Sequence, residues 1–177
     1  MEDLITKLIE LDRKRDSEER LPKSETEITS SEFSKSGAAF EIRRGKLPWP
    51  VTRGKVVAKF GTQQHPVLKT ISQNTGIDIS VPTGTNVYNI ADGEVATIWW
   101  LPSFGNLVIV NHHNGYRTVY AHLSDIEVTE GDKVSEGSRI GRSGESITGS
   151  LVHFEIWKNR DKQDPELWLY PQNISKK

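Results

Sequence analysis

The chain has 177 residues, a formal net charge of −1 and no cysteine. This length allows one domain with a sizeable core. The balanced charge argues against a nucleic-acid partner, and the absence of cysteine excludes disulfide bonds and thiolate chemistry. No apolar run approaches the ~18 residues that a transmembrane helix needs. The first residues lack the basic and apolar regions of a secretory signal.

Residues 1–20 combine dense charges with apolar side chains at helical spacing. These apolar residues are Leu4, Ile5, Leu8, Ile9 and Leu11. The pattern predicts a short amphipathic helix, which would be either the end of a coiled coil or a regulatory arm. A helix of few turns is marginal alone and needs a surface to pack on, although a solvated tail is an equally open interpretation. Residues 21–45 are rich in Ser, Thr, Glu and Lys, which predicts an irregular linker.

From Lys46 onward, short β-rich runs alternate with Gly, Pro and Asn. The predicted strands cover residues 56–60, 76–81, 86–91, 94–101, 106–112, 116–123 and 151–157. Asn114-Gly115 lies where a tight hairpin requires positive φ angles. No later stretch shows sustained helical periodicity. We therefore predict an all-β domain of short antiparallel strands over residues 46–172, followed by a tail at 173–177.

Three blocks of this zone resemble the LytM/lysostaphin-type zinc metallopeptidase domain. They read FGTQQHP…NTGIDISVPTGTNVYNIADGEV, GNLVIVNHHNGYRTVYAHLS and GRSGESITGSLVHFEI. Their order and spacing make the signal stronger than any single motif. The resemblance covers residues 46 to about 170 and implies a LytM-type β-sandwich or barrel-sandwich hybrid. The opening KLPWPVTRG is more similar to the murein hydrolase activator (EnvC-type) branch.

The resemblance implies that active members hold zinc through His-x-x-x-Asp and the second histidine of His-x-His. Residues two or four apart on a strand point to the same face, so both motifs deliver side chains into one groove. Three protein ligands leave a position for water, whose pKa the zinc lowers to about 7. Two further histidines handle protons and stabilise the transition state.

This sequence departs from the family pattern at two of those five positions. Asn74 stands in place of the first zinc ligand, and Leu151 in place of the first histidine of His-x-His. Asp78, His122 and His153 are kept. A neutral amide is a poor zinc ligand compared with imidazole, and leucine cannot transfer a proton. We therefore expect no catalytic residues, no enzyme activity and no metal cofactor.

Other side chains could still contribute to the groove. His65 could swing in as a substitute ligand, whereas His112 and His113 point to opposite faces of a strand and are expected at the surface. Of Trp99 and Trp100, one should face inward and the other outward, where it could contact a sugar, a peptide or a protein. The predicted partner-binding groove consists of Asn74, Trp100, Tyr120, His122, Leu151 and His153.

The EnvC-type branch implies a function without catalysis. Its members resemble LytM peptidases that have lost their site and instead switch on cell-wall amidases. We therefore expect a periplasmic fragment that binds and activates a peptidoglycan amidase during cell division or cell-wall remodelling. Residues 1–20 could mask its groove at rest. The alternatives are a peptidoglycan-binding module, a weakly active zinc-dependent peptidoglycan endopeptidase or, for a complete chain, a cytosolic structural role.

Overall fold

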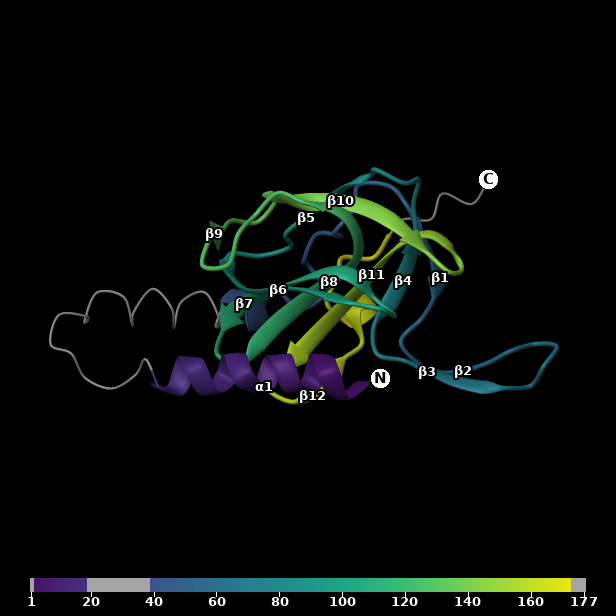
Figure 1. Ribbon diagram of the computed structural model, residues 1–177, viewed down its shortest axis with the longest axis horizontal. Coiled ribbons are helices and arrows are strands. Elements are labelled where there is room, and N and C mark those ends of the chain that lie inside the picture. Colours follow the sequence, from purple (N-terminus) through teal and green to yellow (C-terminus); the bar gives the residue numbers. More distant parts are fainter. Residues whose placement is uncertain (1, 19–38, 173–177) are drawn as a thin grey trace, which may run out of the picture.

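The computed structural model describes residues 2–18 and 39–172 of the chain, so the predicted tail and most of the predicted linker lie outside the described residues. The N-terminal helix is α1 (Glu2–Glu18), and a 3-10 helix, η1 (Pro165–Leu167), lies near the C-terminus. The strands are β1 (Lys55–Ala58), β2 (Gly61–Gln64), β3 (Ile71–Asn74), β4 (Ile77–Ser80), β5 (Asn86–Tyr88), β6 (Gly93–Leu101), β7 (Gly105–His113), β8 (Tyr116–Ile126), β9 (Lys133–Val134), β10 (Arg139–Ser146), β11 (Gly149–Lys158) and β12 (Asp161–Gln163). The predicted all-β domain with an N-terminal helix is confirmed (Figure 1).

Ten strands form one curved antiparallel sheet. Its main order is β1-β4-β11-β10-β8-β7-β6-β9, with β5 paired to β10, β12 paired to β11, and a further pairing of β11 with β8. Strands β2 and β3 form a separate ribbon that projects away from the sheet (Figure 1). No helix in the described ranges is long and apolar enough to cross a membrane.

Strand alternation gives the sheet two different faces. On β11, Val152, Phe154 and Ile156 point into the main hydrophobic core. Leu151, His153, Glu155 and Trp157 must therefore point to the opposite face, because successive side chains alternate along a strand. We call this opposite face of β4, β11, β8 and β7 the groove face.

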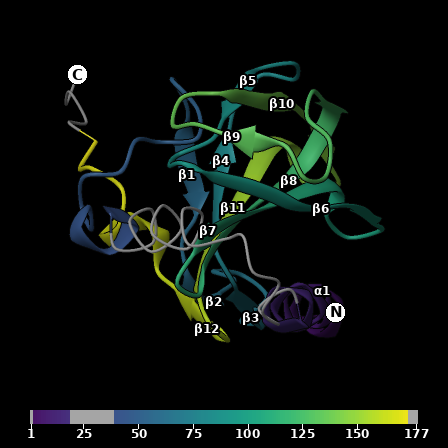
Figure 2. The same ribbon diagram turned by 90° about the vertical axis from the view of Figure 1, so that its left-hand side faces the viewer.

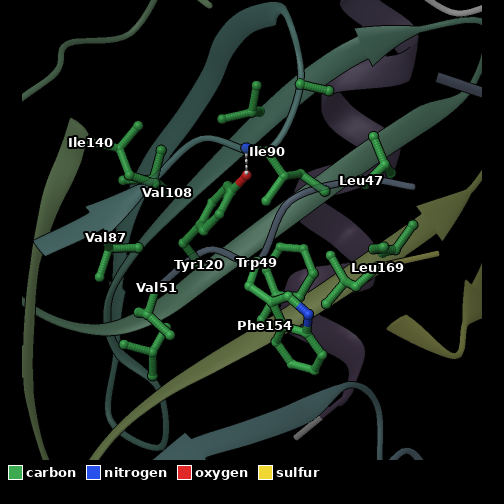
Figure 3. Close-up of a cluster of buried hydrophobic side chains, with 14 of the residues drawn as sticks. Leu47, Trp49, Val51, Val87, Ile90, Val108, Tyr120, Ile140, Phe154 and Leu169 are labelled. Atoms are coloured by element: carbon green, nitrogen blue, oxygen red, sulfur yellow. Dashed lines mark hydrogen bonds between the residues drawn. The ribbon is translucent and has the colours of Figure 1, made fainter. Parts of the chain in front are cut away.

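The main core is filled by residues of the domain itself. Figure 3 shows Tyr120 of β8 packed among apolar side chains, where its hydroxyl accepts a hydrogen bond from the Ile90 N–H (3.1 Å). The same hydroxyl donates a hydrogen bond to Asn89 Oδ1 (3.1 Å). Tyr120 is completely buried. Its predicted place in the partner-binding groove is therefore wrong, because its side chain lies on the core face of the sheet.

The packed domain begins earlier than we predicted. Residues 39–42 form a helical turn, and Phe40 is 1% exposed. Its ring stacks on Tyr116 (centroids 4.8 Å apart) and contacts Trp168 (5.4 Å). Residues 39–45 are therefore part of the packed structure and not irregular linker, because an aromatic side chain within them completes the core.

Helix α1 covers part of the groove face. Ile5 and Ile9 are buried in a second apolar cluster, which the sheet completes with Leu107, Ile109, Val119, Ala121 and Trp157. In Figure 2 the molecule is viewed along the axis of α1, and the helix lies against one side of the sheet. This packing explains the amphipathic pattern, since the apolar stripe of α1 lies against apolar residues of four strands, β6, β7, β8 and β11.

Candidate functional site

The register of β4 and β11 brings two of the predicted site residues together. His153 lies opposite Asp78 in this antiparallel pair. His153 Nδ1 donates a hydrogen bond to Asp78 Oδ1 over 2.6 Å. Directly opposed side chains of neighbouring strands point to the same side, so both groups belong to the groove face.

A second carboxylate holds the other nitrogen of the same imidazole. His153 Nε2 donates to Glu155 Oε1 over 2.9 Å, and Glu155 is 1% exposed. Glu155 also accepts hydrogen bonds from the Thr75 hydroxyl and from Trp157 Nε1 (2.6 Å). Glu155 was not among the predicted site residues, although its position two residues after His153 on a strand was a usable signal.

The two carboxylates decide the charge of His153. Burial alone would lower the pKa of His153, but the hydrogen bonds to Asp78 and Glu155 outweigh burial and raise it to about 9. Burial would likewise raise the pKa of Glu155, but its hydrogen bond to His153 and the charge of that imidazolium lower it. At neutral pH the site therefore contains an imidazolium between two carboxylates.

A β-bulge turns His122 toward this group. Asn106 lies opposite Leu123 and Val108 opposite Tyr120, so two residues of β8 face one residue of β7. His122 has a φ of 59°, a conformation that is uncommon for a residue other than glycine. The bulge breaks the alternation after Tyr120, which explains why His122 and Tyr120 do not share a face.

Phe104 connects His122 with His153. Its ring centroid lies 6.2 Å from that of His122 and 5.2 Å from that of His153. Burial lowers the pKa of His122, and the charge of His153 acts in the same direction. His122 is therefore a neutral imidazole at pH 7. Phe104, which lies in the β6–β7 turn, was not among the predicted site residues.

The two substituted side chains, Asn74 and Leu151, each interact with neighbouring residues. Asn74 Oδ1 accepts a hydrogen bond from the Gly76 N–H (3.3 Å), while its buried Nδ2 has no hydrogen-bond partner among the described residues. Leu151 is 6% exposed and lies opposite Ser80 in the β4–β11 ladder. Neither side chain adds a nitrogen or carboxylate ligand to Asp78 and His153.

This donor set does not fit a catalytic zinc ion. Such an ion requires three good protein ligands, whereas Asp78 and His153 are bonded to each other and Asn74 presents an amide. Within the described residues, no three His, Asp or Glu side chains are arranged to hold a metal. His65 does not supply the missing ligand, because its Nδ1 accepts hydrogen bonds from the Val67 and Leu68 N–H groups in its own turn.

Three further predictions need correction. His112 is not at the surface: it is fully buried, with Nδ1 donating to the Asp92 carbonyl oxygen (2.9 Å). Trp99 and Trp100 are both exposed, at 53% and 60%, because their hairpin extends past the packed sheet. Trp99 lies opposite Leu107 of the groove face, so the adjacent Trp100 points to the other side and does not line the groove.

Helix α1 continues the groove face beyond His153. Arg117 lies opposite Trp157 in the β8–β11 ladder, and Ala121 lies opposite His153. Arg117 Nε donates to Asp12 Oδ2 of α1 over 2.7 Å, and both side chains are 2% exposed. The helix thus covers one end of the groove face through apolar contacts and a buried ion pair, next to the end that carries His153.

Comparison with known proteins places this geometry in a family. The sequence model described as Peptidase family M23 matches residues 72–165. The chain is 38% identical over 128 residues to the peptidoglycan DD-endopeptidase ShyA of Vibrio cholerae, which covers 70% of this chain and 29% of ShyA. It is 39% identical over 116 residues to the cell division protein DipM of Caulobacter vibrioides, covering 64% of this chain and 18% of DipM. The chain therefore spans less than a third of either relative.

Solved structures show the same fold. A zinc-containing peptidase from Vibrio cholerae superimposes with a TM-score of 0.63 and 30% identity, covering 70% of this chain and 40% of the peptidase. A chain of the SpoIIQ–SpoIIIAH pore-forming complex also superimposes with a TM-score of 0.63, at 28% identity, covering 72% of this chain and 92% of that one. The fold thus occurs both in a zinc peptidase and in a protein–protein complex.

Proposed function

Because the chain belongs to Peptidase family M23, we propose that it is a LytM-type domain without catalysis that binds and activates a peptidoglycan amidase. The activation would serve cell division or cell-wall remodelling in the bacterial periplasm. One observation carries the proposal: His153 is fixed between Asp78 and Glu155, in a groove where Asn74 replaces the first imidazole ligand.

The chemistry of the groove supports binding over hydrolysis. Hydrolysis by a zinc-bound water requires a metal with an open coordination position. Here the His153 nitrogen that faces Asp78 carries a proton and donates a hydrogen bond to that carboxylate. Leu151, at the position of a proton-transferring histidine, cannot transfer a proton.

The relatives support a cell-wall setting and a binding role. ShyA is a peptidoglycan endopeptidase, DipM is a cell division protein, and SpoIIQ forms a complex with SpoIIIAH. We carry over the cell-wall setting from the first two relatives and the use of this fold as a binding partner from the third.

The position of α1 suggests how binding is regulated. The helix occupies apolar positions on the groove face, and the amidase would use this surface once α1 leaves. Removal of α1 would expose Leu107, Ile109, Val119 and Trp157 as one apolar patch around Arg117. An amphipathic helix of the partner fits such a patch. Activation then depends on a population shift between a covered and an open groove.

Dye release from labelled peptidoglycan tests the function directly. The chain alone should release no dye, and it should raise release by a cell-wall amidase from the same organism by roughly 5- to 150-fold. The matched control is the variant Val119→Glu, which places a charge on the apolar patch and should abolish activation. Dye release by the chain alone that a chelator abolishes would establish the endopeptidase alternative instead. No effect of the chain on any amidase of that organism would reject the activator role.

A further inference from the structure

The β6–β7 hairpin exposes two large indoles. Trp99 and Trp100 are 53% and 60% exposed, whereas the other three tryptophans of the chain are at most 9% exposed. The hairpin projects outward beyond the other strands next to the β6 label (Figure 2). Tryptophan presents both a broad apolar face and an N–H donor, so an exposed indole suits a ligand that is itself partly apolar and partly polar.

The surroundings of this hairpin determine which ligands fit. From Val95 to Tyr116 the sequence contains no Asp, Glu, Lys or Arg, although 27% of the chain is charged. The nearest charges have mixed signs. Glu94 lies opposite Lys133, Glu130 accepts from the Ile98 N–H, and Arg15 of α1 donates to the Ala96 carbonyl oxygen (2.8 Å). This combination disfavours an anionic membrane surface, which attracts clusters of Lys and Arg, and favours an uncharged ligand.

The backbone at Trp100 is also available for binding. Among the described residues, β9 pairs with β6 only at Gly93 and Glu94. The Ile98 N–H donates to Glu130 Oε1 (2.8 Å), so it points away from β7 and toward the outer edge of β6. The same direction recurs two residues later along a strand, which turns the Trp100 N–H toward the open edge.

We propose that Trp100 and the open edge of β6 bind a neutral glycan of N-acetylated sugars. The indole face packs against the C–H face of a pyranose ring, and the Trp100 N–H donates to an acetamido carbonyl oxygen. The Glu130 carboxylate lies at the same edge and accepts hydrogen bonds from sugar hydroxyls. The identification of the ligand rests on the cell-wall setting proposed above, but not on the amidase.

The position of this glycan site allows a glycan and a protein partner in the groove to bind at the same time. Trp100 points to the side of the hairpin opposite Trp99, which shares the groove face with Leu107. A glycan bound at Trp100 therefore leaves the groove open for a protein partner. The domain would hold its partner close to a glycan strand by binding both at once, which raises the effective concentration of the substrate.

Fluorescence titration of the full chain with N-acetylchitotetraose tests the site, and cellotetraose serves as the comparator that lacks acetamido groups. We expect tryptophan emission to move to shorter wavelength with the acetylated sugar, and binding at least about tenfold weaker in Trp100→Ala. Trp99→Ala is the matched control and should bind within about threefold of the parent chain. Trp100→Phe keeps a ring at the site and should retain most of the binding, which separates loss of contact from loss of folding.

Each other outcome identifies a different occupant and overturns the proposal. An emission shift that follows protein concentration without sugar indicates a second copy of the chain. Binding to neutral lipid vesicles but not to the tetrasaccharide indicates a membrane. Equal losses in both alanine variants, or no response to sugar, reject the glycan site. Since no amidase is present, such a failure leaves the activator role untouched, and a failed amidase assay leaves the glycan site untouched.

Discussion

Two buried histidines on opposite faces of one sheet carry different charges. His112 on the core face forms hydrogen bonds with two neutral groups, the Asp92 carbonyl and the Thr118 hydroxyl, and burial lowers its pKa to about 4. Burial acts on His153 as well, but two carboxylates outweigh it and raise the pKa to about 9. The core face thus accepts polar groups only when they are neutral, whereas the groove face retains a charged cluster.

The two faces also differ in what covers them. The core face is closed by side chains of the β-domain itself, including Phe40, Tyr120 and Phe154. The groove face depends on α1, whose contacts include two buried isoleucines and the Asp12–Arg117 ion pair. A surface covered by one short helix can exchange that helix for a partner, which a closed core cannot do.

Restoring both substituted side chains should have the largest effect, because it changes the chemistry of the groove face. We expect Asn74→His with Leu151→His to bind zinc at least about a hundredfold more tightly than the parent chain, because a third good ligand joins Asp78 and His153. Metal analysis after dialysis measures the difference. The pair Asn74→Gln with Leu151→Gln controls for polarity without an imidazole. Equal zinc content in all three proteins would show that the substituted positions do not determine metal binding.

Removing Glu155 should be the most destabilising single change on the groove face. Glu155→Leu leaves the His153 imidazolium with one carboxylate and removes the acceptor of the Trp157 N–H. Breaking a buried charged pair costs about 3–5 kcal/mol, which urea unfolding would measure. Glu127→Ala is the control, since Glu127 pairs with Arg139 near the surface and its loss costs about 0–1 kcal/mol. Similar losses in both variants would show that the buried cluster adds no special stability.

The sequence predicted the fold and the central pair of the site because both depend on regular periodicity. The resemblance to the LytM-type domain placed Asp78 and His153 in one groove, strand alternation explained why the residues of each motif share a face, and the structure confirms the pair. The same alternation also linked Glu155 to His153, although that signal was not used. The N-terminal helix was predictable for a similar reason, since its apolar residues recur at helical spacing.

The errors arise where regular periodicity ends. Tyr120 was predicted to line the groove together with His122, but the bulge in β8 breaks the alternation between them. Trp100 was assigned there although the paired strands turn it to the other side of the hairpin. Phe40 was read as linker because one aromatic residue in a polar stretch has no periodic signal. A bulge, a pairing register and a single long-range contact depend on distant chain segments, so local pattern does not reveal them.

The two buried histidines should limit stability at opposite ends of the pH scale. The folded pKa of His153 is about 9, above the ordinary 6.5, so its contribution is full below pH 6.5 and is lost as pH rises toward 9. The folded pKa of His112 is about 4, so its contribution is full above pH 6.5 and is lost as pH falls toward 4. Each residue changes the free energy of unfolding by at most about 1.4 kcal/mol per pH unit within its window.

Single substitutions separate the pH range in which His153 affects stability from the range in which His112 does. Urea unfolding from pH 4 to 9 should show a flatter acid side in His112→Asn and a flatter alkaline side in His153→Gln. Each variant should keep the slope that belongs to the other histidine. A parent profile without an alkaline slope would contradict the charged state of His153, and one without an acid slope would contradict the neutral state of His112.

The smallest effect should come from loosening α1 without disturbing the sheet. Asp12→Asn removes the negative charge that faces Arg117 in a contact from which solvent is almost excluded. The substitution should weaken the docking of α1 by about 1–3 kcal/mol. That cost falls on the docking of α1 alone, so hydrogen exchange should accelerate in α1 while the core strands keep their protection. Glu10→Gln is the matched control, because the pair of Glu10 with Arg160 is exposed and contributes about 0–1 kcal/mol. If α1 masks the groove, Asp12→Asn should also raise amidase activation above that of Glu10→Gln. Faster exchange without higher activation would mean that the amidase binds elsewhere on the domain.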